Sequence, residues 1–150
     1  MRNVVAATLA VALIAGPAQV AGPAQVAGAH HRNPDRDVPC ERIHWRNRNL
    51  EDTQEAVRRL IRCAQRRWSV PGGAEKALAV ARCESRFIPW AYGGGNAGVY
   101  QHNLAYWRQR WVRWGSPLGL RSNPYNARSN VVVTMRMVHA SQSWAPWACA

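Results

Sequence analysis

Hydrophobic residues recur at helical spacing in four stretches of the chain, and each stretch predicts a helix. The stretches are residues 49–68, 74–86, 103–115 and 123–141. In the first of them, acidic residues stand at the start and arginines toward the end, as the helix dipole favours. No segment alternates hydrophobic and polar residues over any length, and the glycine-rich residues 91–98 are expected to form a loop. The pattern therefore predicts a small, mainly helical domain.

The last two predicted helices carry side chains that allow two interpretations. Trp107, Trp111 and Trp114 recur at helical spacing, which is more typical of a core face than of a binding surface. Residues 131–134, Val-Val-Val-Thr, have the composition of a strand. We nevertheless predict a helix there, with Asn126 as its N-cap.

The first 29 residues are predicted to be a signal peptide. Arg2 precedes an uncharged apolar run at residues 4–15, and Ala27-Gly28-Ala29 offers a small-residue cleavage site. The run is shorter than the roughly 20 residues of a membrane-spanning helix, and an uncleaved membrane tether is the alternative. Residues 30–39 are polar and proline-punctuated, so we expect a flexible arm before a single domain at 40–150. These features predict a secreted protein.

Four cysteines in an exported chain predict two disulfides, for which three pairings are open. Nineteen arginines and one lysine give a formal net charge of +12. Such a charge favours adsorption to polyanions, whether nucleic acid, acidic lipid or an anionic wall polymer. Because no nucleic-acid-binding motif is present, no specific nucleic acid is expected, and most arginines are interpreted as a solvated surface. The terminal pair His30-His31 is not expected to hold a metal.

Glu84 is the only acidic residue that follows Glu75. It lies on the same helical face as the apolar residues within 77–81, so its side chain projects toward the side expected to be buried. A carboxyl in an apolar setting loses solvation, which raises its pKa and suits it to act as a general acid. The alternative is a structural glutamate paired with Arg82 or Arg86.

An ordered set of residues surrounds this glutamate. It comprises Glu84-Ser85, Phe87, Pro89, Gly98-x-x-Gln101, Trp107, Tyr125-Asn126-Ala127-Arg128 and the aromatic, cysteine-bearing end WAPWAC at 144–149. In this set the chain resembles the soluble lytic transglycosylase family of the lysozyme superfamily, and most of all its small secreted actinobacterial members. The resemblance covers about residues 74–150. The loop before Gln101 is shorter and richer in glycine than is typical of the family.

The resemblance implies a lysozyme-like α+β domain in which Glu84 is the catalytic acid and base. Ser85 would hold its carboxyl or the substrate. Tyr100 and Gln101 would line the sugar cleft, and Asn126 would support the cleft from the last helix.

Two further features depend on this resemblance. Trp90 and Tyr92, in the glycine-rich loop, are candidates for stacking on sugar rings. In the resembling proteins the cysteine beside the glutamate bonds to the cysteine near the C-terminus. This implies a disulfide Cys83–Cys149 and leaves Cys40 to pair with Cys63.

Together these features predict a secreted peptidoglycan lytic transglycosylase that cleaves the MurNAc–GlcNAc linkage and leaves a 1,6-anhydro-MurNAc end. One acid suffices for that reaction, whereas most glycosidases use two carboxylates. We expect a monomer that needs no metal or cofactor and binds glycan strands, with its arginines holding it on anionic wall polymers. One alternative is a hydrolytic muramidase with a second acid from Glu51, Asp52 or Glu75. The other is a non-catalytic cationic wall-binding protein, which the short loop favours.

Overall fold

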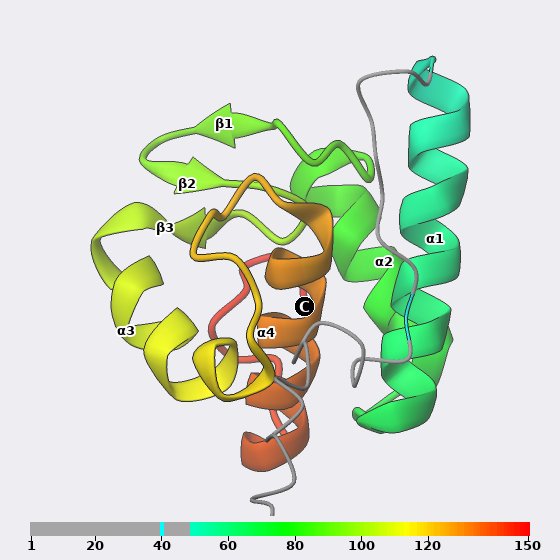
Figure 1. Ribbon diagram of the computed structural model, residues 1–150. Coiled ribbons are helices and arrows are strands. Elements are labelled where there is room, and N and C mark those ends of the chain that lie inside the picture. Colours follow the sequence, from blue (N-terminus) through cyan, green and yellow to red (C-terminus); the bar gives the residue numbers. More distant parts are fainter. Residues whose placement is uncertain (1–39, 41–48) are drawn as a thin grey trace, which may run out of the picture. The chain divides into compact units, whose positions relative to one another are not determined.

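The computed structural model describes Cys40 and residues 49–150, so the predicted signal peptide and arm lie outside the described residues. Four α-helices and three short strands form the fold (Figure 1). In chain order the elements are α1 (Leu50–Arg67), α2 (Gly73–Ser85), β1 (Tyr92–Gly93), β2 (Asn96–Ala97), β3 (His102–Asn103), α3 (Leu104–Trp114), the 3-10 helix η3 (Ser116–Leu118) and α4 (Ala127–Ser141). The mainly helical class and all four predicted helices are confirmed.

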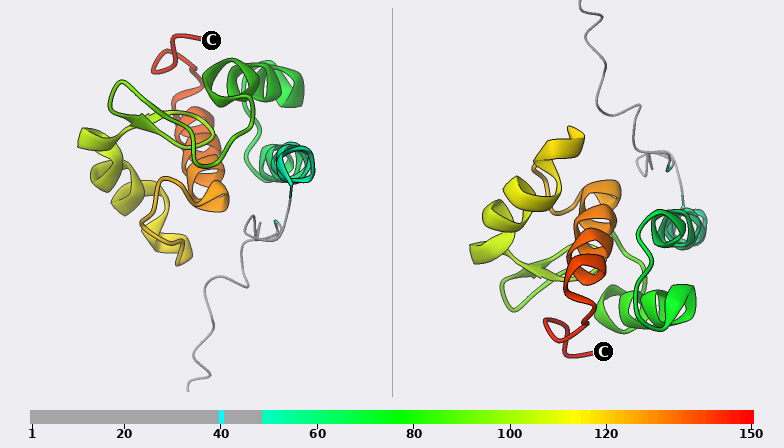
Figure 2. Two further views of the ribbon diagram at one scale, coloured as in Figure 1. Left: turned by 90° about the horizontal axis from the view of Figure 1, so that it is seen from above. Right: turned by 90° about the horizontal axis from the view of Figure 1, so that it is seen from below.

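α1 forms where the hydrophobic pattern predicts it. Asn49 caps the helix, because its Oδ1 accepts a hydrogen bond of 2.8 Å from the backbone amide of Asp52. The apolar stripe of α1, which includes Leu60 and Ile61, is fully buried. The helix lies beside α2, as Figure 2 shows.

α4 is the central helix, with α1 on one side and α3 on the other (Figure 2). Every residue from Ala127 to Met135 is buried. A helix enclosed on all sides needs hydrophobic residues around its whole circumference, so the valine run at 131–134 fits a helix as well as a strand. Asn126 is the predicted cap, and its Oδ1 accepts a hydrogen bond of 3.0 Å from the amide of Ser129.

The glycine-rich segment is more ordered than the predicted loop. β1 pairs with β2 through Tyr92↔Ala97 and Gly93↔Asn96, and β2 pairs with β3, all antiparallel. Gly94 and Gly95 form the β1–β2 turn with φ of 56° and 79°, a conformation that favours glycine. Each strand has two residues. A strand of two residues is too short to produce an alternating pattern, which explains why the sequence did not reveal it.

Trp107 and Trp111 connect α3 to the rest of the fold, in agreement with the structural role that their spacing indicated. Trp107 is buried, and its indole N–H donates to the carbonyl of Ser122 at 2.9 Å. Trp111, half-buried, donates in the same way to Leu120 at 2.9 Å. Both bonds tie α3 to the segment that leads back to α4.

His102 on β3 is fully buried and lies in a chain of hydrogen bonds that reaches α4. Arg110 can only donate, so its contact of 2.9 Å to Nδ1 leaves the ring proton on Nε2. Nε2 then donates to Thr134 Oγ1 at 2.8 Å, and that hydroxyl donates to the carbonyl of Asn130 at 2.9 Å. Burial first, and the Arg110 charge second, lower the pKa of His102 from 6.5 to about 3. The imidazole is therefore a neutral structural group.

Candidate functional site

Glu84 occupies the last turn of α2, where the helix meets the sheet region. Ala77, Val80 and Ala81 on the same side of the helix are fully buried, as the spacing predicted. The helix ends directly after Ser85 because Arg86 takes a left-handed conformation with φ of 55°. The carboxyl of Glu84 is thus placed at the border between the core and solvent, and its side chain is half-buried.

The surroundings of Glu84 favour its protonated form. Burial raises the pKa of the Glu84 carboxyl, and a hydrogen bond from the Cys149 backbone amide opposes that rise. Within the described residues, neither Arg82 nor Arg86 forms an ion pair with this carboxyl. Residues two positions apart on a helix do not face each other, so the structural pairing considered from the sequence is absent.

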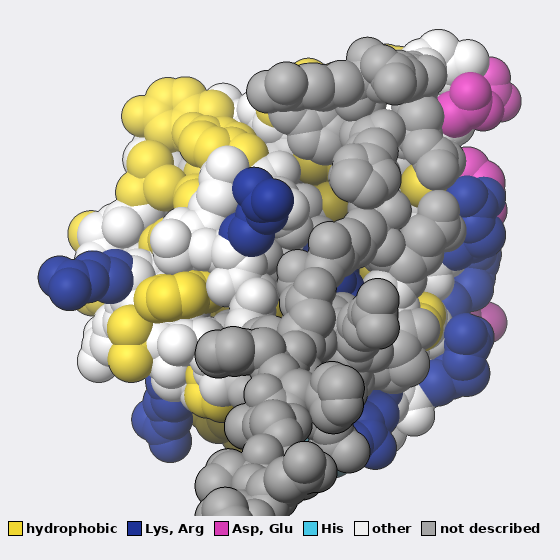
Figure 3. Space-filling model, viewed as in Figure 1, with side chains coloured by type: hydrophobic (Ala, Val, Ile, Leu, Met, Phe, Trp, Pro, Cys, Tyr) yellow, Lys and Arg dark blue, Asp and Glu magenta, His cyan; other side chains and the backbone are white. Residues whose placement is uncertain are grey.

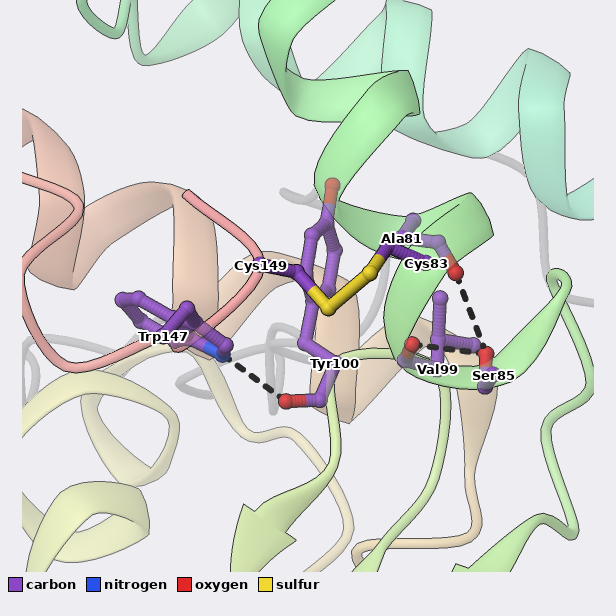
Figure 4. Close-up of a disulfide and its surroundings, with 7 residues drawn as sticks. All are labelled: Ala81, Cys83, Ser85, Val99, Tyr100, Trp147 and Cys149. Carbon is purple, nitrogen blue, oxygen red and sulfur yellow. Dashed lines mark hydrogen bonds between the residues drawn. A yellow bond between two sulfur atoms is a disulfide. The ribbon is translucent and has the colours of Figure 1, made fainter.

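The C-terminal segment is bonded to the same turn of α2. Both disulfides that the resemblance implies are present, Cys83–Cys149 with a Cα–Cα distance of 5.9 Å and Cys40–Cys63 with 5.7 Å. Figure 4 shows the first of them at the end of α2, with Trp147 beside it. The indole N–H of Trp147 donates to the carbonyl of Tyr100 at 2.8 Å. The disulfide thereby keeps the Cys149 amide at the carboxyl of Glu84.

Ser85 connects α2 to the segment before β3. Its Oγ donates to the carbonyl of Val99 at 2.7 Å (Figure 4). The amide of Ile88 donates to the same Oγ at 3.2 Å. The side chain is buried. Ser85 therefore positions backbone, whereas the resemblance implied a contact with the Glu84 carboxyl or with substrate.

Tyr100 differs most from its predicted role. Its side chain is 0% exposed, and its hydroxyl donates to the carbonyl of Ala77 at 2.9 Å. The ring packs against Trp144 and Trp147 at centroid distances of 6.1 and 6.3 Å. A side chain enclosed in the core cannot touch a glycan on the surface, so the predicted substrate contact of Tyr100 is wrong. A motif position alone does not reveal which way its side chain points.

Gln101 and Asn126 also act on the backbone. The side-chain amide of Gln101 donates to the carbonyls of Ala91 at 3.1 Å and Gly98 at 2.8 Å, bracing the turn between β2 and β3. Asn126 caps α4, as described above. Gln101 thus supports the sheet region and Asn126 supports α4. The Oδ1 of Asn126 accepts hydrogen bonds from both the amide and the hydroxyl of Ser129.

Asn130 is a positioning residue that the sequence did not single out. Its Oδ1 accepts from the amide of Tyr100 at 2.8 Å, while Nδ2 donates to the carbonyls of Ala97 at 3.1 Å and Pro124 at 2.9 Å. The available signal was an amide directly before the valine run of a helix expected to be buried, because buried polar groups need partners. Asn130 fixes the strand segment that Ser85 reaches from the other side.

Trp90 and Tyr92 remain accessible, as their predicted role requires. They are 43% and 64% exposed. Two exposed residues at the start of α3 also belong to this accessible group, Leu104 at 40% and Tyr106 at 57%. The spacing of the tryptophans in α3 did not indicate them. The amide of Leu104 donates to the carbonyl of Gly95 at 2.9 Å, which ties the start of α3 to the β1–β2 turn. Figure 3 shows hydrophobic side chains gathered over this hairpin.

No protein-family model, curated protein or solved structure matches the chain. Among the described residues, no group of three or more His, Cys, Asp or Glu side chains could hold a metal ion. Within the same part of the chain, every helix is too short or too polar to cross a membrane. Glu84 and its surroundings are therefore the features of the described residues that bear on function.

Proposed function

We propose that the chain is a secreted peptidoglycan lytic transglycosylase of lysozyme-like fold, with Glu84 as its catalytic acid and base. The observation that carries the proposal is the setting of Glu84. Its carboxyl is half-buried at a helix end, its pKa is raised by burial, and a disulfide holds the adjoining segment against it. A raised pKa keeps a larger fraction of the carboxyl protonated near neutral pH, as a general acid requires.

The reaction needs one carboxyl used twice. Protonated Glu84 donates its proton to the oxygen of the MurNAc–GlcNAc bond, and the bond from that oxygen to C1 breaks. The carboxylate then accepts the proton of the C6 hydroxyl, whose oxygen bonds to C1. The products are a free GlcNAc hydroxyl and a 1,6-anhydro-MurNAc end, and Glu84 is protonated again.

The other described acids differ from Glu84 in position, pairing or exposure. Glu75 precedes Glu84 by nine residues on α2, which is about 13 Å along the helix axis and beyond the roughly 5–9.5 Å that paired carboxyls span. Glu55 is held by Arg58 and Arg62 at 3.3 and 3.9 Å. Glu51 and Asp52 are exposed in the first turn of α1.

Accessible aromatic side chains supply a surface for the glycan. Trp90 and Tyr92, with Tyr106 added by the structure, can stack on sugar rings through their exposed faces. The two disulfides are compatible with an oxidising, extracytoplasmic setting, in which such bonds persist.

The test is mass spectrometry of purified peptidoglycan after incubation with the protein and with Glu84→Gln. Glu75→Gln is a matched control, because it removes a glutamate from the same helix. We expect muropeptides that end in 1,6-anhydro-MurNAc from the wild type and the control but not from Glu84→Gln. Glu84-dependent reducing ends would instead establish hydrolysis and direct the search to a second acid.

A non-catalytic wall-binding protein is the second candidate. It is favoured by the compact hairpin at 92–97, which leaves less protein around the sugar than the longer loop typical of the resembling family. Release of no fragments, together with sedimentation of the protein with the wall, would support this candidate.

A further inference from the structure

A groove of about 780 Å³ lies between α1 and α2. Its walls include three arginines, one from α1 and two from the end of α2. The lining that matters here is Arg58, Arg82, Arg86, Gln54, Cys83 and Phe87. A volume of this size is typical of a ligand site, and the three guanidinium groups make it strongly basic.

The three arginines differ in how firmly they are held. Arg58 is in place already, because its guanidinium lies 4.5 Å above the ring of Phe87 and 3.3 Å from the carboxylate of Glu55. Arg82 and Arg86 are exposed and form no ion pair with any described residue. Two guanidinium groups therefore face the groove without a described counter-ion.

This groove is separate from the Glu84 site. Arg82 stands two residues before Glu84 on α2, which places it about 160° away around the helix axis. Glu84 is not part of the lining. The two sides of α2 thus carry different chemistry, a carboxyl on one and guanidinium groups on the other.

We propose that the groove binds the phosphodiester groups of an extended polyol-phosphate polymer. Guanidinium groups match phosphate oxygens with two parallel hydrogen bonds, and several of them along one groove suit a chain with repeated charges. Bases of single-stranded nucleic acid bind by stacking on aromatic rings. The only ring in the described lining, Phe87, is 5% exposed and lies under Arg58, so the groove offers no stacking platform.

The test compares two variants of equal net charge, Arg82→Gln/Arg86→Gln and Arg59→Gln/Arg108→Gln. Arg59 on α1 and Arg108 on α3 are exposed and lie outside the groove, so this pair controls for loss of charge alone. Binding of fluorescently labelled poly(glycerol phosphate) to the full chain is measured by anisotropy at several salt concentrations. Thermal unfolding of each variant verifies that it is folded.

We expect the groove variant to lose about tenfold or more in affinity, because charge-assisted hydrogen bonds are lost. The control variant should lose about threefold or less in affinity. The slope of log affinity against log salt concentration should decrease by an amount equivalent to about two charges, and only for the groove variant. Equal losses in the two variants would overturn the proposal in favour of diffuse charge.

Three competitors and one further variant complete the experiment. Polyglutamate of similar length should compete weakly for the groove. The binding of single-stranded DNA to the protein should not depend on Arg82 and Arg86. Equal competition by polyglutamate would overturn the phosphodiester assignment. DNA binding that needs this arginine pair would overturn the assignment to a polyol-phosphate polymer. Inorganic phosphate should compete at high concentration. Glu84→Gln should bind the polymer as the wild type does, so this proposal and the proposed catalysis can fail independently.

Discussion

Asn130 and Gly98 show how closely the strand segment approaches α4. The amide of Asn130 donates to Ala97 and Pro124, and Gly98 lies between these partners. A Cβ at Gly98 would stand 2.2 Å from the Nδ2 of Asn130 and 2.2 Å from the carbonyl oxygen of Pro124. The φ of Gly98 is 80°, so this position demands glycine for two reasons, its conformation and its contacts.

Gly98→Ala and Gly95→Ala separate these two reasons. Gly95 has nearly the same φ, 79°, but nothing lies within 4 Å of its hypothetical Cβ. We expect Gly95→Ala to lower the free energy of unfolding by about 1–2 kcal/mol. Gly98→Ala should cost about 2–3 kcal/mol more, because Asn130 or the strand must move. Urea denaturation measures the free energy of unfolding of both variants. Equal losses would mean that α4 moves to accommodate the added methyl group without loss of stability.

Glu84→Gln is expected to separate stability from activity. The pKa of Glu84 is raised by burial, so the folded state holds this proton more strongly than the unfolded state. The stability that Glu84 contributes is therefore lost as pH rises through its folded pKa. Glu84→Gln should have a free energy of unfolding at least as large as that of the wild type at pH 7. At pH 3 it should show no increase in this free energy over the wild type.

Denaturation at both pH values tests this expectation, with Glu75→Gln as the control. Glu75 is exposed near the start of α2, where its substitution should not produce the same pH-dependent gain. A Glu84→Gln protein that is clearly less stable at pH 7 would show that the ionised carboxyl stabilises the fold.

α2 and the C-terminal segment depend on each other at the scale of elements. The Cys83–Cys149 bond closes a separation of 66 residues, whereas Cys40–Cys63 closes one of 23. Trp144 and Trp147 bury their rings against Tyr100, and Trp144 also donates to the carbonyl of Pro71 at 2.9 Å. The segment thereby bridges the start of α2 and its end.

Removal of each disulfide by paired Cys→Ser substitution should have unequal effects. The chain-entropy relation gives a loss of about 4 kcal/mol for Cys83–Cys149 and about 3 kcal/mol for Cys40–Cys63. Only the first change also frees the Cys149 amide, whose hydrogen bond lowers the pKa of Glu84. The alkaline limb of the activity profile should then move to higher pH for the Cys83/Cys149 variant alone. An unchanged profile would show that the amide stays in place without the bond.

The helices were predictable and the arrangement of side chains between them was not. Asn49 and Asn126 indicate where α1 and α4 begin, because each caps the helix that directly follows it in the sequence. Tyr100 bonds to a partner 23 residues away, and two of the partners of Asn130 are 30 and 33 residues away, so no local pattern contains them. Arg82 is a different case. Its spacing from Glu84 already excluded a face-to-face pair, and helical geometry would have placed it on the opposite side.

At the scale of the whole molecule, α4 is the common support for both the helical pair and the sheet. It contacts α1, and through Asn130 and Thr134 it holds the strand segment and His102. The hydrogen-bond chain through His102 requires a neutral imidazole, because Arg110 already donates to Nδ1. Protonation of this ring would therefore oppose the packing of β3 and α3 on α4.

Acid should destabilise the molecule through His102. Its pKa is about 3 in the folded protein against 6.5 for an ordinary histidine, so the unfolded state binds the extra proton between these values. Stability from this group is fully present above pH 6.5 and falls by up to about 1.4 kcal/mol per pH unit toward pH 3. NMR titration should show the imidazole neutral until the protein unfolds. A titration near pH 6.5 in the folded state would contradict this.

The edge-to-face indoles of the C-terminal segment have an optical consequence. Trp144 and Trp147 lie with ring centroids 5.6 Å apart and planes at 71°. Two identical chromophores this close and oblique couple their excitations, which produces circular dichroism bands of opposite sign near the helical signal. Far-ultraviolet spectra of this protein will therefore misstate its helix content. The disappearance of that couplet, before the helical signal fades, would report that the segment has left the end of α2.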